Sequence, residues 1–509
     1  MQGSEDSSTA QSAPPTEPEG AAAAPPEPRS LIRNTTYLTL ASAATIPLAV
    51  AANALMGRYL GPEEFGYVYV ALTLSSLAVL AVEWGQQGAV PALVARDRQK
   101  AGSFLGTSLV WRAIVAFAAS GVLAVFCQIA GYGQMQKWAV ALTFPFFVLG
   151  SSATAVKDTI RGFERTDIPA LAQVGQQLLA LLVLVPVLLL GGRLRAVLLG
   201  NMAVAAFTVL CLTFALRPLG VGKLRFERSA LKALFGLGTP FVFFELAMAL
   251  LPNVNAAFLA RLVPAHVIGW YGVSQRLIGL LIFPAGALIG ALYPTLCRLH
   301  TQDQAEFARV TRNALYGVAL LAVPAAVGCG FFPELGVAIF GSVKFAGATA
   351  HLRVMSAFIF LVYFSMPLGS CILASNRQRA WALVQCICIL ISVAANPFLI
   401  PYFQRVTGNG ALGTCVTLVL SELFVVGCGV ALAPRAVFNG ELGKSLFLAG
   451  LSGVAMAAVA WLTKPISPFL AVPAALLTYA VVAWLSGAVQ PSTAEKIKDL
   501  LNRKLLRRA

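Results

Sequence analysis

The side chains best able to do chemistry in this chain are charged residues that lie well inside long apolar runs. Arg276 is about six residues into its run, Glu422 is about 12 residues into another, and Glu245 lies in the middle of a third. A charge at such a depth in a membrane costs on the order of 3 kcal/mol on insertion scales. Each of these side chains therefore needs a wet cavity or a partner of opposite charge.

Arg276 is the first candidate for ligand binding, because a guanidinium binds phosphate oxygens through two parallel hydrogen bonds. The alternative is that Arg276 extends to the nearer membrane interface. Glu245 and Glu422 could be protonated, could pair with a cation, or could bind a coupling proton or sodium ion. The depths of Glu245 and Arg276 differ by roughly 10 Å on helical rise, which argues against a direct contact between them.

Five further polar residues are candidates for lining a cavity. Asn253 and Asn255 follow Pro252, which frees backbone carbonyls near the outer part of its run, and helix–helix hydrogen bonding is the alternative for both. Lys157 and Arg161 lie at one end of the run 138–156, where they could meet a head group on the cytoplasmic side. Arg112 lies about two turns inside its run, and extension towards the inner interface is the favoured alternative.

These residues must be positioned by membrane helices, because the composition excludes other classes of protein. Of 509 residues, 58% are apolar and 11% charged, and the mean hydropathy is +0.78. Soluble proteins carry about 25% charged residues. A soluble enzyme, a disordered chain and a nucleic-acid-binding domain are therefore excluded. Apolar runs lie near 35–57, 66–91, 104–130, 138–156, 168–191, 194–216, 233–260, 267–296, 310–333, 347–374, 381–403, 410–434, 445–463 and 466–489.

The sequence thus predicts an all-α, polytopic membrane protein with about 14 transmembrane helices. An even number of spans puts both termini on one side. Of the 37 Lys and Arg residues, 26 fall on that side and nine on the other. By the positive-inside rule, both termini are predicted to be cytoplasmic in a bacterial inner membrane.

The two ends of the chain differ from the apolar body. Residues 1–30 are rich in Ala, Pro, Ser and Glu, and we expect a disordered acidic cytoplasmic tail. Residues 490–509 carry a capping box at Ser492 and Glu495, followed by a basic amphipathic pattern. Such a helix is expected to lie on an anionic inner leaflet. The nine cysteines lie almost entirely in apolar runs and indicate no metal site.

An internal repeat organises the body. Arg58 and Gly66 are separated by the same spacing as Arg261 and Gly269, at an offset of 203 residues, and the same offset relates Pro91 to Pro294 and Phe104 to Phe307. This predicts an N-lobe of six spans over 31–217 and a C-lobe of six over 218–435, with two further spans in 436–489. Transporters built from such parallel repeats hold their substrate between the halves.

The segment Arg58-Tyr59-Leu60-Gly61-Pro62-Glu63-Glu64-Phe65-Gly66 resembles the R-x-LG-P-x-x-FG turn of polysaccharide flippases, the Wzx-like branch of the multidrug/oligosaccharidyl-lipid/polysaccharide (MOP) superfamily. The segment Gly269-Trp270-Tyr271-Gly272-Val273-Ser274 resembles the G-x-Y-x-x-S that opens helix 8 of that family. The resemblance covers about residues 30–490, without the acidic tail. It implies fourteen helices in two lobes around a central cavity, with basic residues that hold a lipid-linked pyrophosphate.

The resemblance also implies the activity. We expect alternating-access translocation of undecaprenyl-pyrophosphate-linked oligosaccharide units for O-antigen, capsule or exopolysaccharide synthesis. Expected partners are membrane lipids, H⁺ or Na⁺ as coupling ion, and polysaccharide polymerase and export proteins, with no nucleic acid. No enzyme motif or cofactor motif occurs: Gly443-Lys444-Ser445 lacks the first glycine of a phosphate loop. Alternatives are a lipid II flippase, a multidrug or cation antiporter of the same superfamily, and a polysaccharide polymerase or ligase.

Overall fold

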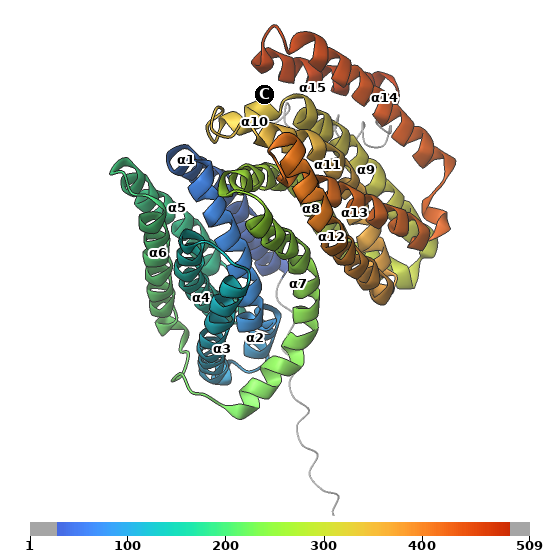
Figure 1. Ribbon diagram of the computed structural model, residues 1–509. Helices are drawn as coiled ribbons and strands as arrows, with labels where there is room; N and C mark the ends of the chain where they lie inside the picture. Colours follow the sequence, from blue (N-terminus) through green and yellow to red (C-terminus); the bar gives the residue numbers. More distant parts are fainter. Residues whose placement is uncertain (1–27, 489–509) are drawn as a thin grey trace, which may run out of the picture.

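The structure is a computed structural model that describes residues 28–488 (Figure 1). Within these residues every regular element is a helix and no strand occurs, so the predicted all-α class is confirmed. Most of the predicted acidic tail, 1–30, and the predicted amphipathic helix, 490–509, lie outside the described residues.

Most helices coincide with one predicted apolar run, but the helix Pro28–Glu83 contains the run 35–57 and most of 66–91, and the short helix Pro333–Ala338 corresponds to no predicted run. In chain order they are α1 (Pro28–Glu83), α2 (Gln86–Arg96), α3 (Ala101–Ile129), α4 (Gln134–Gly162), α5 (Asp167–Leu189), α6 (Leu194–Ala215), α7 (Arg228–Leu262), α8 (Ala265–Gln302), α9 (Gln304–Phe331), α10 (Pro333–Ala338), α11 (Ala348–Ala374), α12 (Gln378–Thr407), α13 (Ala411–Leu432), α14 (Gly440–Thr463) and α15 (Pro468–Leu485).

Twelve helical segments in the described part of the chain are long and apolar enough to cross a membrane. One of them, Ala44–Arg96, has 53 residues. At 1.5 Å per residue it is about 80 Å long, more than twice the thickness of a hydrocarbon core. The helix is interrupted at Gly61, whose φ of 76 and ψ of 177 are not helical. The helix α7 is not among the twelve candidate spans. A polytopic membrane protein is confirmed, while the number of fourteen spans stays a prediction.

The least distinct predicted boundary, between the runs 168–191 and 194–216, is confirmed. α5 ends at Leu189 and α6 begins at Leu194. Gly191 takes the left-handed conformation, with φ 77, which a residue without a Cβ adopts at little cost. The short Gly191-Gly192-Arg193 segment is therefore a real turn between two helices.

The helices form two groups that α7 joins (Figure 1). Helices α1 to α6, blue to green, gather on one side, and α9 with α11 to α13, yellow to orange, gather on the other. The helix α7 packs on α1, α2 and α3 and also on α12. The helices α14 and α15 pack on each other and on α9 at the outer edge. The exact lobe boundaries stay a prediction.

Large apolar side chains cover the outward faces of these helices. On α3 alone, Ile114, Phe117, Val122, Val125 and Ile129 are exposed. Soluble proteins rarely expose contiguous apolar patches of such extent, whereas hydrocarbon covers them in a membrane. The outer surface therefore agrees with the twelve candidate spans.

The kink at Gly61 predicts that a side chain at this position destabilises the fold. A Cβ at Gly61 would meet no heavy atom within 4 Å, so Gly61→Ala should act through its positive φ alone. We expect a loss of about 1–3 kcal/mol in the free energy of unfolding, measured in detergent, because glycine is almost the only residue that adopts this combination of φ and ψ. Gly121→Ala is the control, because Gly121 lies within α3 and is equally uncrowded. Its expected effect is a gain of about 0.5–1 kcal/mol. Equal effects of the two variants would contradict the kink.

Candidate functional site

The two groups of helices meet where the backbones of α1 and α8 touch. A Cβ added to Gly66 would collide with the carbonyl oxygen of Ala265 and would lie 3.0 Å from the nitrogen of Gly269. A Cβ added to Gly269 would collide with the carbonyl oxygen of Pro62 and would lie 2.7 Å from its carbonyl carbon. Only glycine permits this approach, as at close helix crossings in membranes generally. We call this contact the seam.

The seam has the reciprocity of a two-fold axis. The offset of 203 carries Pro62 onto Ala265 and Gly66 onto Gly269, so the contact of Gly66 with Ala265 is the counterpart of the contact of Gly269 with Pro62. Each half therefore uses the same two positions to contact the other half, which is the definition of an isologous contact. This geometry is what the predicted internal repeat requires.

The two arginines of the repeat also act reciprocally. Arg58, which follows the first predicted span, donates through Nε to the carbonyl oxygen of Ile339 at 2.8 Å. Arg261, which ends α7, donates through Nη1 to the carbonyl oxygen of Ala130 at 2.6 Å. Each arginine thus ties its own half to a loop of the other half. The sequence alone suggests only anchoring at the membrane interface for both.

Aromatic rings fill the space around the seam. The ring of Phe65 lies edge-to-face against Phe340 and Phe345, with centroids 6.2 and 6.0 Å away. Deeper in, Tyr69 of α1 lies edge-to-face against Tyr271 of α8 at 5.7 Å. The end of the molecule that carries the seam, predicted to be periplasmic, is therefore closed by direct packing of the two halves.

Arg276 lies about 10 Å further along α8 than Gly269. Its side chain is accessible to solvent, yet protein surrounds the guanidinium on most sides and Tyr69 is close enough to interact with it electrostatically. A charged side chain that stays exposed within a predicted span needs water or an anionic partner, because hydrocarbon solvates a charge poorly. Arg276 forms no hydrogen bond or ion pair with any residue that the structure describes. It therefore leaves its guanidinium donors available to a ligand.

The acidic candidates differ from each other. Glu422 of α13 is partly accessible and accepts a hydrogen bond from the Ser365 hydroxyl of α11. It makes no ion pair within the described part of the chain. Glu245 falls within α7, but its side chain lies outside the described residues.

The two asparagines of α7 take different environments. Asn255 is buried and accepts a 2.8 Å hydrogen bond from Nδ2 of Asn396 on α12, so it joins two helices. Asn253 donates to the carbonyl oxygen of Ala249 in its own helix, at 2.9 Å. Its Oδ1 is buried and has no partner among the described residues, and Asn253 is one of the residues that line an apolar cavity of about 580 Å³ between α1, α3 and α7. Asn396 was not foreseen, although an amide inside an apolar run is a visible signal.

Arg112 neither lines a cavity nor extends to the interface, which corrects both expectations for it. The side chain is 1% exposed. Nη1 forms an ion pair with Oε1 of Glu83 at 3.3 Å and donates to the carbonyl oxygen of Ser151 at 2.6 Å. Pairing with a buried carboxylate inside the bundle replaces the solvent that an extended arginine would seek.

Lys157 and Arg161 are half-buried at the other end of the molecule from the seam. Lys157 donates to Oε1 of Gln176 at 3.4 Å, and Arg161 pairs with Oδ1 of Asp158 at 3.0 Å. Arg161 therefore belongs with the buried charges around Arg112 rather than with Arg276. The two groups of basic candidates are separate.

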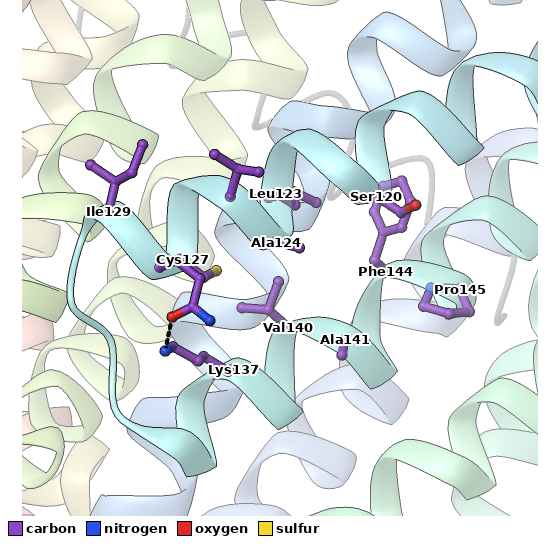
Figure 2. Close-up of a pocket in the computed structure, with 12 residues that line it drawn as sticks. Ser120, Leu123, Ala124, Cys127, Ile129, Lys137, Val140, Ala141, Phe144 and Pro145 are labelled. Atoms are coloured by element: carbon purple, nitrogen blue, oxygen red, sulfur yellow. Dashed lines mark hydrogen bonds between the residues drawn. The ribbon is translucent and has the colours of Figure 1, made fainter.

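Two further hollows flank these groups. One, between α3 and α4, holds about 510 Å³ and is lined mainly by apolar side chains such as Leu123, Val140 and Phe144 (Figure 2). The Lys137 ammonium, bonded to Gln128, lies at its rim. The other, of about 880 Å³, lies beside the seam and contains the ion pair of Arg193 with Glu64, at 2.7 Å. None of the predicted cavity residues lines either hollow.

Within residues 28–488, no group of three or more His, Cys, Asp or Glu side chains is arranged to hold a metal ion.

Comparison with known proteins decides the family. A model of the family described as "Polysaccharide biosynthesis protein" matches residues 55–350, more than half of the chain. The chain belongs to this polysaccharide biosynthesis protein family. The match confirms the family indicated by the motifs around Gly66 and Gly269. No curated protein sequence matches the chain.

Solved structures share the fold. The lipid II flippase MurJ in an inward closed conformation superposes with a TM-score of 0.70 at 13% identity, over 88% of this chain and 98% of its own. An inward-facing multidrug resistance MATE family transporter of the MOP superfamily gives 0.62 at 15% identity, over 79% and 96%. A MOP superfamily transporter from Pyrococcus furiosus gives 0.54 at 14%, over 79% and 94%. The chain therefore has the fold of MOP transporters, and these neighbours are transporters or flippases rather than enzymes.

The seam predicts a specific effect of crowding. Gly66→Ala should force α1 and α8 apart, because the new methyl group would overlap the Ala265 carbonyl. Phe65→Cys, added in the same chain, should then react with a water-soluble maleimide several-fold faster, as measured by mass spectrometry of the labelled peptide. Gly279→Ala on α8 is the control, since its Cβ would meet nothing within 4 Å. Unchanged labelling in the Gly66 variant would show that the seam does not close this end.

Proposed function

We propose that this protein is a flippase that moves undecaprenyl-pyrophosphate-linked oligosaccharide units across the bacterial inner membrane for O-antigen, capsule or exopolysaccharide synthesis. The observation that carries the proposal is Arg276: an accessible, enclosed guanidinium without a partner among the described residues, in a member of a polysaccharide biosynthesis family. Pyrophosphate is the part of such a lipid that most needs a cation, and the sugar and pyrophosphate must both avoid hydrocarbon.

Tyr69 of α1 is half-buried near Arg276 and suits the rest of the head group, whereas Tyr271 of α8 is 2% exposed and packs edge-to-face against the Tyr69 ring. Aromatic faces pack against the apolar faces of sugar rings, and hydroxyls supply hydrogen bonds. The polyprenyl chain would stay in the membrane while the head group occupies the space between the halves. Because only the head group enters the protein, a few polar side chains are enough to bind the substrate.

Transport by alternating access requires that the seam opens when the opposite end closes. The positive-inside pattern puts the seam at the periplasmic end and both termini in the cytoplasm. The closed seam then corresponds to a state that receives lipid-linked oligosaccharide from the cytoplasmic side. Separation of Gly66 from Ala265, and of Gly269 from Pro62, would release the head group outward.

A lipid II flippase is the second candidate, favoured by the match to MurJ over 88% of this chain. Reconstituted vesicles that hold either a lipid-linked repeat unit or lipid II separate the two, because only the transported lipid becomes accessible to a sugar-modifying enzyme outside. A multidrug antiporter would instead move a cationic dye, for which Arg276 is unsuited. H⁺ or Na⁺ coupling and association with polymerase and export proteins belong to the proposal.

Arg276→Gln tests the phosphate site. Loss of a charged, two-bonded contact should lower the transport rate by about tenfold or more, measured as exposure of the lipid-linked unit in vesicles with equal protein content. Arg276→Lys should retain part of the rate, because the charge remains without the planar fork.

Arg298→Gln is the matched control, because Arg298 is an exposed arginine near the far end of the same helix, α8. Its rate should stay near that of the unmodified protein. Normal transport by the Arg276→Gln variant at normal abundance would remove Arg276 from the proposed site.

Locking the seam should stop transport. Phe65→Cys and Phe345→Cys replace two rings in contact across the seam, so oxidation or a short bifunctional reagent should join the halves. Transport should fall to background when cross-linking is complete and should return on reduction of the disulfide.

The control pair is Phe360→Cys with Phe364→Cys, two neighbouring positions one turn apart on α11. Cross-linking within one helix should leave transport intact. Undiminished transport by a fully cross-linked seam would rule out alternating access through this end.

A further inference from the structure

A group of buried charges lies far from the seam, where the first long helix breaks. Trp84, at the end of α1, has a φ of 44, which non-glycine side chains rarely adopt, and Gly85 follows with a φ of 63 before α2 begins. Such backbone outliers persist only where surrounding contacts hold them, and they gather at functional sites. Interrupted helices of this kind mark ion and substrate sites in membrane transporters.

The charges around this break come from three elements. Glu83 ends α1, Arg112 lies on α3, and Asp158 lies on α4; their side chains are 6%, 1% and 0% exposed. Arg112 pairs with Glu83 at 3.3 Å, and Asp158 pairs with the half-exposed Arg161 at 3.0 Å. Asp158 is close enough to both Glu83 and Arg112 to interact with them electrostatically.

The group is not fully satisfied. Oδ2 of Asp158, Nη2 of Arg112 and Nε2 of Gln86 are buried and have no hydrogen-bond partner among the described residues. The other members are bonded, as Gln87 is to Glu83 at 2.6 Å and Ser108 to Gln86 at 2.5 Å. A buried carboxylate oxygen without a donor is costly, and the cost is much smaller if the oxygen carries a proton, because the group is then neutral.

We propose that Asp158 is a proton-binding site, tuned by Glu83, Arg112 and Arg161, and that its loading is coupled to movement of the two halves. The coupling part rests on the proposed transport function, whereas proton binding does not. A proton taken from water forms an O–H bond at Oδ2 and leaves Asp158 neutral. The net charge of these four side chains then rises from zero to +1.

A proton fits this site better than a metal cation. Hard cations need several oxygen ligands, and here the guanidinium groups of Arg112 and Arg161 already pair with the carboxylates of Glu83 and Asp158. The charged groups that act on Asp158 are Arg161 on its own helix, Arg112 from α3 and Glu83 from α1. Lys157, also on α4, is close enough to interact with Asp158, and α2 contributes the neutral Gln86. Lys157 and Arg161 are partly accessible at the predicted cytoplasmic end, and Arg161 is in direct contact with Asp158.

The break transmits the state of this group to α7. Trp84 donates through Nε1 to the Thr239 hydroxyl at 3.4 Å, and a Cβ on Gly238 would lie 2.6 Å from the Trp84 carbonyl oxygen. The rings of Trp84 and Trp111, neighbours of Glu83 and Arg112, both pack on Phe235. Because α7 also holds Asn255, which bonds α12, and Arg261 of the seam, it spans the distance between the charge group and the seam.

Infrared difference spectroscopy on the full-length protein in lipid vesicles tests proton binding directly. The carbonyl band of a protonated carboxylic acid should appear as pH falls and should be missing from Asp158→Asn. The control is Asp167→Asn, which removes a carboxylate paired with Arg165 at the surface and should keep the band. Identical spectra for the Asp158 variant and the unmodified protein would overturn the proposal.

If Asp158→Asn folds poorly, two variants at neighbouring residues test the proposal through the pH at which the Asp158 band titrates. Glu83→Gln leaves Arg112 uncompensated, so the Asp158 band should titrate with a midpoint at lower pH, an affinity for the proton lower by about tenfold. Arg161→Gln removes a favourable cation and should move the midpoint to higher pH by a similar factor. Midpoint shifts in the same direction in both variants, or no shift in either, would contradict the proposal that Glu83 and Arg161 tune proton binding at Asp158.

Transport in vesicles with and without an imposed pH gradient tests the coupling. The unmodified protein should respond to the gradient several-fold, and Asp158→Asn should not. If both respond alike, the coupling is wrong while transport stands. If the Asp158 band titrates but neither protein moves a lipid-linked oligosaccharide, the transport function fails while the proton site stands.

Discussion

The approach of two backbones at Gly66 and Gly269 is the constraint on which the rest of the structure depends. A Cβ at either glycine would overlap a carbonyl of the opposite half, so α1 and α8 can cross this closely only at these residues. The same contact, made twice, sets the register of the halves. It also places Tyr69 against Tyr271, and the exposed Arg276 follows about two turns further along α8 than Gly269. Arg58 and Arg261 then secure the loops on either side.

Because a charged side chain in hydrocarbon has a high free energy, each charge within a predicted span needs a compensating environment, and three such environments occur among the residues discussed above. Arg112 and Glu83 neutralise each other inside the first group of helices, and Glu422 is stabilised by the Ser365 hydroxyl. Arg276 has neither solution within the described residues and relies on access to solvent. Only this last environment leaves a guanidinium free for an anionic head group, so the proposed substrate site at Arg276 is separate from the proposed proton site around Asp158.

Local pattern predicted the membrane class, the helix order and the family, because apolar run length and the Arg–Gly spacing are properties of single segments. The equal spacing in Arg58–Gly66 and Arg261–Gly269 also predicted a repeat, whose reciprocal contact the structure displays. Side-chain partners were not predictable. Each residue turns a helix by 100°, so a small error in rotation separates true partners such as Arg112 and Glu83, 29 positions apart. The proposed role of Asp158 could not be predicted, because it depends on side chains from three helices that are far apart in the sequence.

The central claim is that the seam opens during transport of a polyprenyl-pyrophosphate-linked oligosaccharide. Spin labels at Leu190→Cys and Val343→Cys, two highly exposed positions in opposite halves, would report the distance across the seam by pulsed electron paramagnetic resonance once the exposed Cys211 and Cys386 are replaced by Ser. In vesicles without substrate, a single short distance is predicted. Lipid-linked oligosaccharide should add a second, longer population, and Arg276→Gln should suppress it. One unchanged distance under turnover would contradict the account.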